Sequence, residues 1–284
     1  MSLLIKLPDG SSGHGFSYWT KLMGCRRQAE LSTNHEVVKA VGGLDGQAVG
    51  ILMHAMLELY DQGQLGSDEL ETLKFEQHYA ATPINVIEAK RLMNWWILNY
   101  EPEHFGKTFC VEQLMPDDPE LTKLFGIPSH KKLTARLDLM TDVNEETIER
   151  LARTRGLILP RPGLYIVDHK WYKSRTGFTE VLNGMQSLGY PFVAQRWLDL
   201  HHPERRDDLQ GIIFHFGIKT KTPDSIAFFR QPDYEEDLLI LRSFFEEALE
   251  RESRGNKTNP TLCYPFAQHA CPFAPDEHGY CRRF

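Results

Sequence analysis

Three short segments in the middle of the chain have the residue pattern of β-strands. They are KTFCVEQLM (107–115), KLTARLDLMTDV (132–143) and GLYIVDHKWYK (163–173). Apolar and polar residues alternate along each segment, β-favouring residues are frequent, and glycine, proline or charged residues bound each run. Because alternate residues of a strand lie on the same face of a sheet, these segments predict a sheet that is buried on at least one face.

Segments with helical spacing surround these strands. Helices are expected at about 16–31, 45–62, 82–100, 179–200 and 232–252, and two more strands at 209–219 and 225–231. The connection 144–163 is interpreted as a helical excursion or a long loop. This order, without an internal repeat, predicts a mixed α/β fold whose central sheet is flanked by helices. The length of 284 residues favours about two domains. However, no linker separates two units, so we expect one domain over 1–284 with its core at about 45–252.

The composition sets limits on function. Hydrophobic residues make up 41% of the chain, enough for a sizeable core. The net charge of −7 excludes a protein that coats nucleic acid by bulk positive charge, but it leaves room for a local basic cleft. No apolar run approaches the roughly 18 residues of a membrane span, and the N-terminus lacks a signal-peptide pattern. We therefore expect a soluble cytoplasmic protein that does not interact with membranes.

Two of the predicted strands carry acidic residues on their polar faces. In the segment 163–173, Asp168 and Lys170 share one face, and Val167 and His169 point the other way. An acid and a lysine on a buried strand lose hydration energy unless they serve each other or a ligand. In the segment 132–143, one face is expected to hold Thr134, Arg136, Asp138 and Met140, and the other Leu133, Ala135, Leu137 and Leu139.

If the two strands are neighbours, Asp138 and Asp168 meet and form a hard-oxygen site suited to Mg²⁺ or Mn²⁺. The adjacent Lys170 ammonium would then stabilise a phosphate oxygen or orient an attacking water. The alternative interpretation is structural: each acid could be a capping or salt-bridged residue, and the lysine a residue at the rim of the sheet.

An Asp in one strand followed by D-x-K in the next resembles the PD-(D/E)XK nucleases, in particular their RecB-like branch. Two further motifs occur in the order of that branch. Gly50-Ile-Leu-Met-His54 lies in the helix before the sheet, and Gln186-Ser-Leu-Gly-Tyr190 lies in the helix after the lysine strand. One cysteine before the core and three after it resemble the iron–sulfur members, AddB and the CRISPR-associated RecB-like exonucleases. The resemblance implies a restriction-endonuclease-like core.

The resemblance also implies a role for each motif residue. Asp138, Asp168 and His54 would hold the catalytic Mg²⁺ or Mn²⁺, and Lys170 would be the catalytic lysine. Gln186 and Tyr190, four apart on one helix face, would contact a phosphate, the scissile nucleotide or the lysine. For His54 and Tyr190, the alternative is a structural residue with its hydrogen bonds satisfied.

Two neighbouring acids are further candidates. Glu58, one turn after His54, could accept a hydrogen bond from that histidine, or it could be an exposed surface residue. Glu112, in the first strand, either joins the metal shell or is an ordinary strand residue.

Four of the five cysteines, Cys25, Cys263, Cys271 and Cys281, flank the predicted core. Such a thiolate set suits a zinc ion or an iron–sulfur cluster, and the resemblance favours a 4Fe–4S cluster that would join the two chain ends. His269 and His278 lie in the same tail, so a mixed Cys/His zinc site is the alternative. Cys110 is expected to be a buried thiol.

The function implied is that of a metal-dependent DNA nuclease that hydrolyses phosphodiester bonds, an exonuclease on DNA ends or single strands. The alternative is a DNA-end-binding or assembly subunit with a nuclease-like fold that does not cut. The expected partner is DNA, single-stranded or with free ends. The resemblance also allows for homo-oligomers and for repair or recombination partners.

Overall fold

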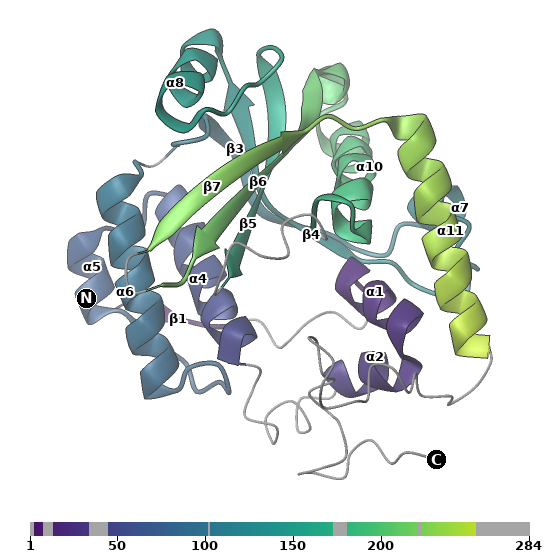
Figure 1. Cartoon of the computed structure of the whole chain (residues 1–284), viewed down its shortest axis with the longest axis horizontal. Helices are drawn as coiled ribbons and strands as arrows, with labels where there is room; N and C mark the ends of the chain where they lie inside the picture. The colour runs from purple at the N-terminus through teal and green to yellow at the C-terminus, as the bar shows by residue number, and fades with distance from the viewer. Residues whose placement is uncertain are drawn as a thin grey trace.

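The computed structural model describes residues 3–7, 14–33, 45–101, 103–172, 181–220 and 223–253. Its centre is a five-stranded mixed sheet in the order β3-β4-β5-β6-β7 (Figure 1). The strands are β3 (Lys107–Met115), β4 (Ala135–Val143), β5 (Gly163–Tyr172), β6 (Leu209–Ile218) and β7 (Asp224–Arg230). Strands β5 and β6 are parallel, and the other neighbouring pairs are antiparallel. The predicted mixed α/β class with a helix-flanked sheet is confirmed.

Helices cover the two faces of the sheet separately (Figure 1). On one side, α4 (Asp45–Asp61) and α6 (Pro83–Asn99) pack on each other and on β4, β5 and β6 through buried residues such as Leu139, Val167 and Ile213. On the other side, α1 (Phe16–Gly24), α10 (Met185–His201) and α11 (Tyr234–Ser253) enclose a second core that includes Ile166 and Phe214. Each face of the sheet therefore has its own hydrophobic core, as the alternation in β5 and β6 requires.

The alternation of β4 is interrupted at Asp138, which corrects the expectation from the sequence. Leu137 packs into the core with α10, whereas Leu139 packs into the core with α4 and α6. In a regular strand these two residues would share a face. The neighbouring strand is irregular at the same row, because Glu112 has a φ of 49°. The strand pair thus changes its pleat where the predicted acidic site lies.

Other boundaries also differ from those predicted. The helix expected at 16–31 is two helices, α1 and α2 (Arg26–Ser32), because Cys25 between them has extended backbone. The connection 144–163 contains α8 (Glu145–Arg155), whose N-terminus is capped by the Asn144 side chain. Short elements without a clear periodic pattern were not predicted: β1 (Leu4–Ile5), α5 (Ser67–Thr72), β2 (Lys74–Phe75), α7 (Pro119–Leu124) and the 3₁₀ helix η1 (Pro203–Asp208).

A glycine lets α1 approach α10 closely. A Cβ atom at Gly189 would overlap the ring of Phe16, which also makes an edge-on contact with the ring of Tyr190. The N-terminal helix therefore supports the helix that carries Gln186 and Tyr190. Within the described residues, no helix has the length and apolar character that crossing a membrane requires.

Candidate metal and catalytic site

Three carboxylate residues lie in one row across β3, β4 and β5. Val111 pairs with Leu139 and Gln113 with Leu137, so Glu112 lies opposite Asp138. Leu139 also pairs with Val167 in β5, and one residue further along this register Asp138 lies opposite Asp168. Residues directly opposite each other in antiparallel strands have their Cβ atoms about 5 Å apart. The register therefore brings together two acids that were predicted to meet and a third, Glu112, that was only an alternative.

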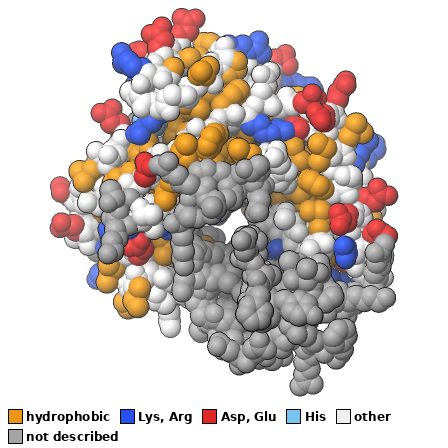
Figure 2. All heavy atoms as spheres, in the orientation of Figure 1, with side chains coloured by type: hydrophobic (Ala, Val, Ile, Leu, Met, Phe, Trp, Pro, Cys, Tyr) orange, Lys and Arg blue, Asp and Glu red, His pale blue; other side chains and the backbone are white. Residues whose placement is uncertain are grey.

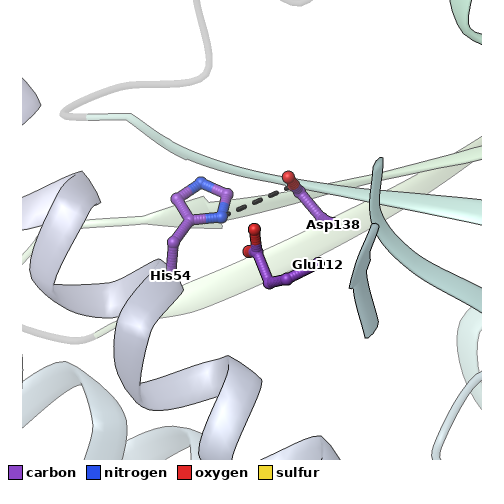
Figure 3. A group of neighbouring side chains, drawn as sticks. All are labelled: His54, Glu112 and Asp138. Atoms are coloured by element: carbon purple, nitrogen blue, oxygen red, sulfur yellow. Dashed lines mark ion pairs between the residues drawn. The ribbon is translucent and has the colours of Figure 1, made fainter. Parts of the chain in front are cut away.

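Helix α4 contributes an imidazole to this row. Nδ1 of His54 lies 3.5 Å from Oδ2 of Asp138. One ligand atom from each of His54, Glu112 and Asp138 can be chosen so that all lie within 4.8 Å of one another, as Figure 3 illustrates. Burial lowers the pKa of His54 to about 4, so the imidazole is neutral at pH 7 and has a lone pair for a metal ion.

The position of Asp138 is fixed by the backbone of β5. Its Oδ2 accepts a hydrogen bond of 3.0 Å from the backbone N–H of His169. Glu112 is held by an ion pair of 2.9 Å between its Oε2 and Nε of Arg136. Its φ of 49° belongs to the left-handed region, which costs a residue with a side chain roughly 1–2 kcal/mol. Strain of this kind concentrates at functional sites, where the surrounding structure maintains it.

Asp168 and Lys170 form a buried ion pair beside this group. Nζ of Lys170 lies 2.7 Å from Oδ1 of Asp168, whose side chain is 0% exposed. The second carboxylate oxygen of Asp168 is buried and has no hydrogen-bond partner among the described residues. An unsatisfied buried carboxylate oxygen loses hydration energy, so it is a candidate to meet a cation or a water. The two residues thus serve each other, as the shared strand face suggested.

The carboxyl groups of this region disfavour ionisation. Burial, opposed by Lys170 and reinforced by Asp138, raises the pKa of Asp168 to about 6. Burial and the neighbouring Asp138 raise the pKa of Glu112 to about 8 and that of Asp61, at the end of α4, to about 7. Burial also raises the pKa of Asp138. Acids that repel one another in a site of low polarity are stabilised by a bound cation.

A pocket of about 820 Å³ opens onto these groups. The predicted residues His54, Asp138, Lys170, Gln186 and Tyr190 all line it. Asp168 is not among them and lies beneath, holding Lys170. Nε2 of Gln186 donates a hydrogen bond to the hydroxyl of Tyr190, and burial raises the pKa of this tyrosine well above its usual value. The structure therefore brings both helix motifs to the same pocket as the acidic strands.

Two features near the site were not predicted from the sequence, and one candidate contact, that of Glu58, is not found among the described residues. Asp61 lies near Asp138, and it could have been suspected from its position two turns after His54 on the same helix. The segment Leu3–Leu7 forms part of the lining, and no motif marks it. Glu58 lines the pocket as well, but within the described residues no hydrogen bond joins it to His54.

Of the four cysteines predicted to bind a metal centre, Cys25 alone lies within the described residues. Cys25 is buried at the junction of α1 and α2 and is a free thiol. Cys263, Cys271 and Cys281, as well as His269 and His278, lie outside the described residues. Cys110 is partly buried, and burial raises the pKa of its thiol to about 12.

Charge on the surface is mixed. On the described part of the face in Figure 2, acidic and basic side chains are interspersed. Basic groups nearer the site include Arg136 and Lys170, both in the lining of the pocket. Positive charge is therefore present at the pocket itself, beside the carboxylates.

Comparisons with known proteins give little further guidance. No family model matches the chain, and no curated protein matches it. One solved structure, described as that of a putative exonuclease from Eubacterium rectale, is similar with a TM-score of 0.36 and 14% sequence identity. The similarity covers 85% of each chain. At this TM-score the similarity does not establish a shared fold.

Proposed function

We propose that this protein is a metal-dependent DNA nuclease of the RecB-like type, an exonuclease that hydrolyses phosphodiester bonds at DNA ends or in single strands. One observation carries the proposal. An imidazole and two carboxylates lie within 4.8 Å of one another, next to a buried aspartate–lysine pair at the wall of an open pocket. The imidazole and the carboxylates can bind a divalent cation, and the lysine can bind a phosphate next to it.

The donor set fits Mg²⁺ or Mn²⁺. Carboxylate oxygens are the preferred ligands of both ions, and Mn²⁺ also accepts imidazole. His54, Glu112 and Asp138 would hold the ion, and the unpartnered oxygen of Asp168 is a further candidate. When bound, such an ion lowers the pKa of a coordinated water and neutralises charge on the phosphate.

The side chains of Lys170 and Tyr190 can contact the substrate directly. Lys170 is held by Asp168 at 2.7 Å and lines the pocket, so its ammonium can donate a hydrogen bond to a phosphate oxygen. That bond strengthens as negative charge develops on the oxygen during the reaction. Gln186 already donates to Tyr190, so Gln186 orients the tyrosine hydroxyl, which can donate to a second phosphate oxygen or to a sugar oxygen.

The alternative is a DNA-end-binding subunit that does not cut. The charge distribution argues against it. Burying Glu112, Asp138 and Asp168 together raises their pKa values and lowers the stability of the metal-free protein. A bound cation would offset this cost. A protein that only holds DNA does not require these acids.

The test is incubation of end-labelled single- and double-stranded DNA with the protein in Mg²⁺, Mn²⁺ or EDTA. We expect cation-dependent cutting that is lost in Asp138→Asn. Asp142→Asn is the matched control, because Asp142 lies on the same strand but binds Arg205 and does not line the pocket. DNA binding without cutting under every condition would favour the alternative. Cutting that persists in Asp138→Asn or in EDTA would contradict the metal mechanism.

We also propose that Cys25, Cys263, Cys271 and Cys281 bind a 4Fe–4S cluster, with zinc as the alternative. The support is the order of the cysteines, one before the predicted core and three after it, and the buried position of Cys25. Metal analysis of anaerobically purified protein tests it. Iron with a brown colour, both lost in Cys25→Ser, is expected. Stoichiometric zinc in a colourless protein would exclude the cluster.

A further inference from the structure

We propose that the segment Leu3–Leu7 is a nucleic-acid-binding wall of the pocket that contains the metal site. In this proposal Lys6 contacts a phosphate of the bound strand other than the one being cut, and Leu4 contacts a base. The inference rests on the proposed nuclease function and adds the element that holds the substrate strand beside the site.

The backbone of this segment is anchored firmly. Lys74 and Glu76 donate backbone hydrogen bonds of 2.9 Å to the carbonyl oxygens of Leu3 and Ile5, which pairs β1 with β2. Ile5 is 7% exposed and Leu7 is 3% exposed, and both belong to the core with α4 and α6. The wall is therefore held by core packing and by strand pairing.

The alternate side chains point away from that core. Leu4 is 61% exposed and Lys6 is also exposed, yet both line the pocket that contains Asp138 and Lys170. In an extended segment, residues 4 and 6 share a face. All five residues of the segment line this pocket, and Leu4 and Lys6 are the two whose side chains are exposed and so accessible to a ligand.

The charges explain what Lys6 can bind. No ion pair of Lys6 occurs within the described part of the chain, although several carboxylates line the same pocket. Once a divalent cation has neutralised the acids of the site, the pocket retains Arg136, Lys170 and Lys6 as positive groups. Asp168 holds Lys170 beside the acids, where the proposed function assigns it to the phosphate being cut, so Lys6 remains for a further phosphate.

The pocket also has an apolar side. Ile51 and Leu59 from α4 line it together with Leu4. A base has apolar faces, and contact with exposed aliphatic side chains removes both surfaces from water. A strand with a phosphate at the metal site can therefore place a base on this apolar side and its next phosphate near Lys6.

The variant Lys6→Gln tests the phosphate contact. Its matched control is Lys74→Gln, since Lys74 is an exposed lysine that pairs with Leu4 in β2 but does not line the pocket. Both changes are made in the Lys170→Ala background, which is expected to bind Mn²⁺ but to cut slowly. Binding of a fluorescein-labelled single-stranded oligonucleotide is then measured by anisotropy at a fixed Mn²⁺ concentration over a series of monovalent salt concentrations. One lost phosphate contact should reduce the slope of log K against log[salt] by about 0.7 and weaken binding roughly three- to fivefold at low salt. The control should keep the wild-type slope.

The variant Leu4→Ala tests the base contact. It should weaken binding of the same oligonucleotide without changing the salt slope, because no charge is lost. In cleavage assays with Mn²⁺, the effect of Lys6→Gln should appear in KM. If the wild type cuts DNA but Lys6→Gln keeps its KM and its salt slope, this inference is wrong and the nuclease assignment stands. If the wild type neither binds nor cuts DNA, the proposed function itself fails.

Discussion

Nδ1 of His54 lies 3.5 Å from Oδ2 of Asp138, which joins helix α4 to strand β4 at the centre of the pocket. The same carboxylate oxygen accepts a hydrogen bond from the backbone of β5. Asp138 is thus positioned by two separate elements, and its oxygen is directed toward the imidazole. This geometry is the core of the proposed metal site.

Replacing His54 by alanine should weaken the binding of Mn²⁺ without unfolding the protein. The imidazole is one of three ligand groups, and we expect the dissociation constant for Mn²⁺ to rise roughly 10- to 100-fold. Isothermal titration calorimetry in the absence of DNA measures it. His130→Ala is the control, because His130 is exposed and lies outside the pocket. Unchanged Mn²⁺ affinity in His54→Ala would remove the histidine from the site.

Replacing Lys170 by alanine should abolish most of the DNA cleavage while Mn²⁺ still binds. The change removes the group that donates to the phosphate and leaves Asp168 without its partner at 2.7 Å. We expect kcat to fall about 100- to 1,000-fold, as for the loss of one oxyanion donor. Lys132→Ala, at an exposed position on the approach to β4, should cut at a rate close to wild type. Cleavage by Lys170→Ala at more than a tenth of the wild-type rate would exclude the proposed role.

The stability of the metal-free protein should fall as the pH rises from about 6.5 to 8.5. Burial raises the pKa of Asp61 to about 7 and that of Glu112 to about 8, whereas carboxyl groups in an unfolded chain titrate near pH 4. The folded protein therefore holds more protons than the unfolded chain in this range, and the free energy of unfolding decreases with pH. Urea unfolding in EDTA measures the trend.

Below about pH 6.5 a second group of residues acts in the opposite direction. Burial lowers the pKa of His104 to about 4 and that of His169 to about 3, so the unfolded chain gains protons first and acid destabilises the fold. Histidines of an unfolded chain titrate near pH 6.5 and are almost fully deprotonated above about pH 7.5, so the range from 7.5 to 8.5 isolates the carboxyl groups. Because Mn²⁺ displaces their protons, its stabilising effect should grow with pH. A larger Mn²⁺-induced rise in Tm at pH 6.5 than at pH 8.5 would contradict this account.

Replacing Glu112 by glutamine should stabilise the metal-free protein and weaken metal binding together. The amide keeps the shape of the side chain but removes a buried carboxylate with a raised pKa. In EDTA at pH 8.5 the free energy of unfolding should rise by an amount on the order of 1 kcal/mol. Glu120→Gln, at an exposed position in α7, should change neither quantity. Lower stability with intact Mn²⁺ binding would show that Glu112 has a structural role.

Local patterns predicted much of the framework correctly. The alternation in 163–173 indicated a strand with Asp168 and Lys170 on one face, and the structure pairs their side chains. Spacing of apolar residues predicted α4 and α6 within one or two residues of their ends. These features depend on neighbours in the sequence, so a sequence is sufficient to predict them.

The errors arose where contacts between distant elements decide the conformation. The pleat of β4 changes between Leu137 and Leu139, because the row of Glu112 and Asp138 is irregular. Likewise, the helix expected at 16–31 is interrupted at Cys25. No proline or glycine marks the break in β4, so periodicity alone continues through it. The break at Cys25 directly follows Gly24, a residue that favours the end of a helix.

By itself, the sequence determined which residue types are present and which of them share a strand or a helix face: Asp168 with Lys170, and Gln186 with Tyr190. The long-range packing placed Glu112 opposite Asp138, brought His54 to the same point, and put Leu3–Leu7 in the lining of the same pocket. The physical reason is that these proximities follow from strand register and from helix packing on the sheet. Both are set by long-range contacts that no local pattern encodes.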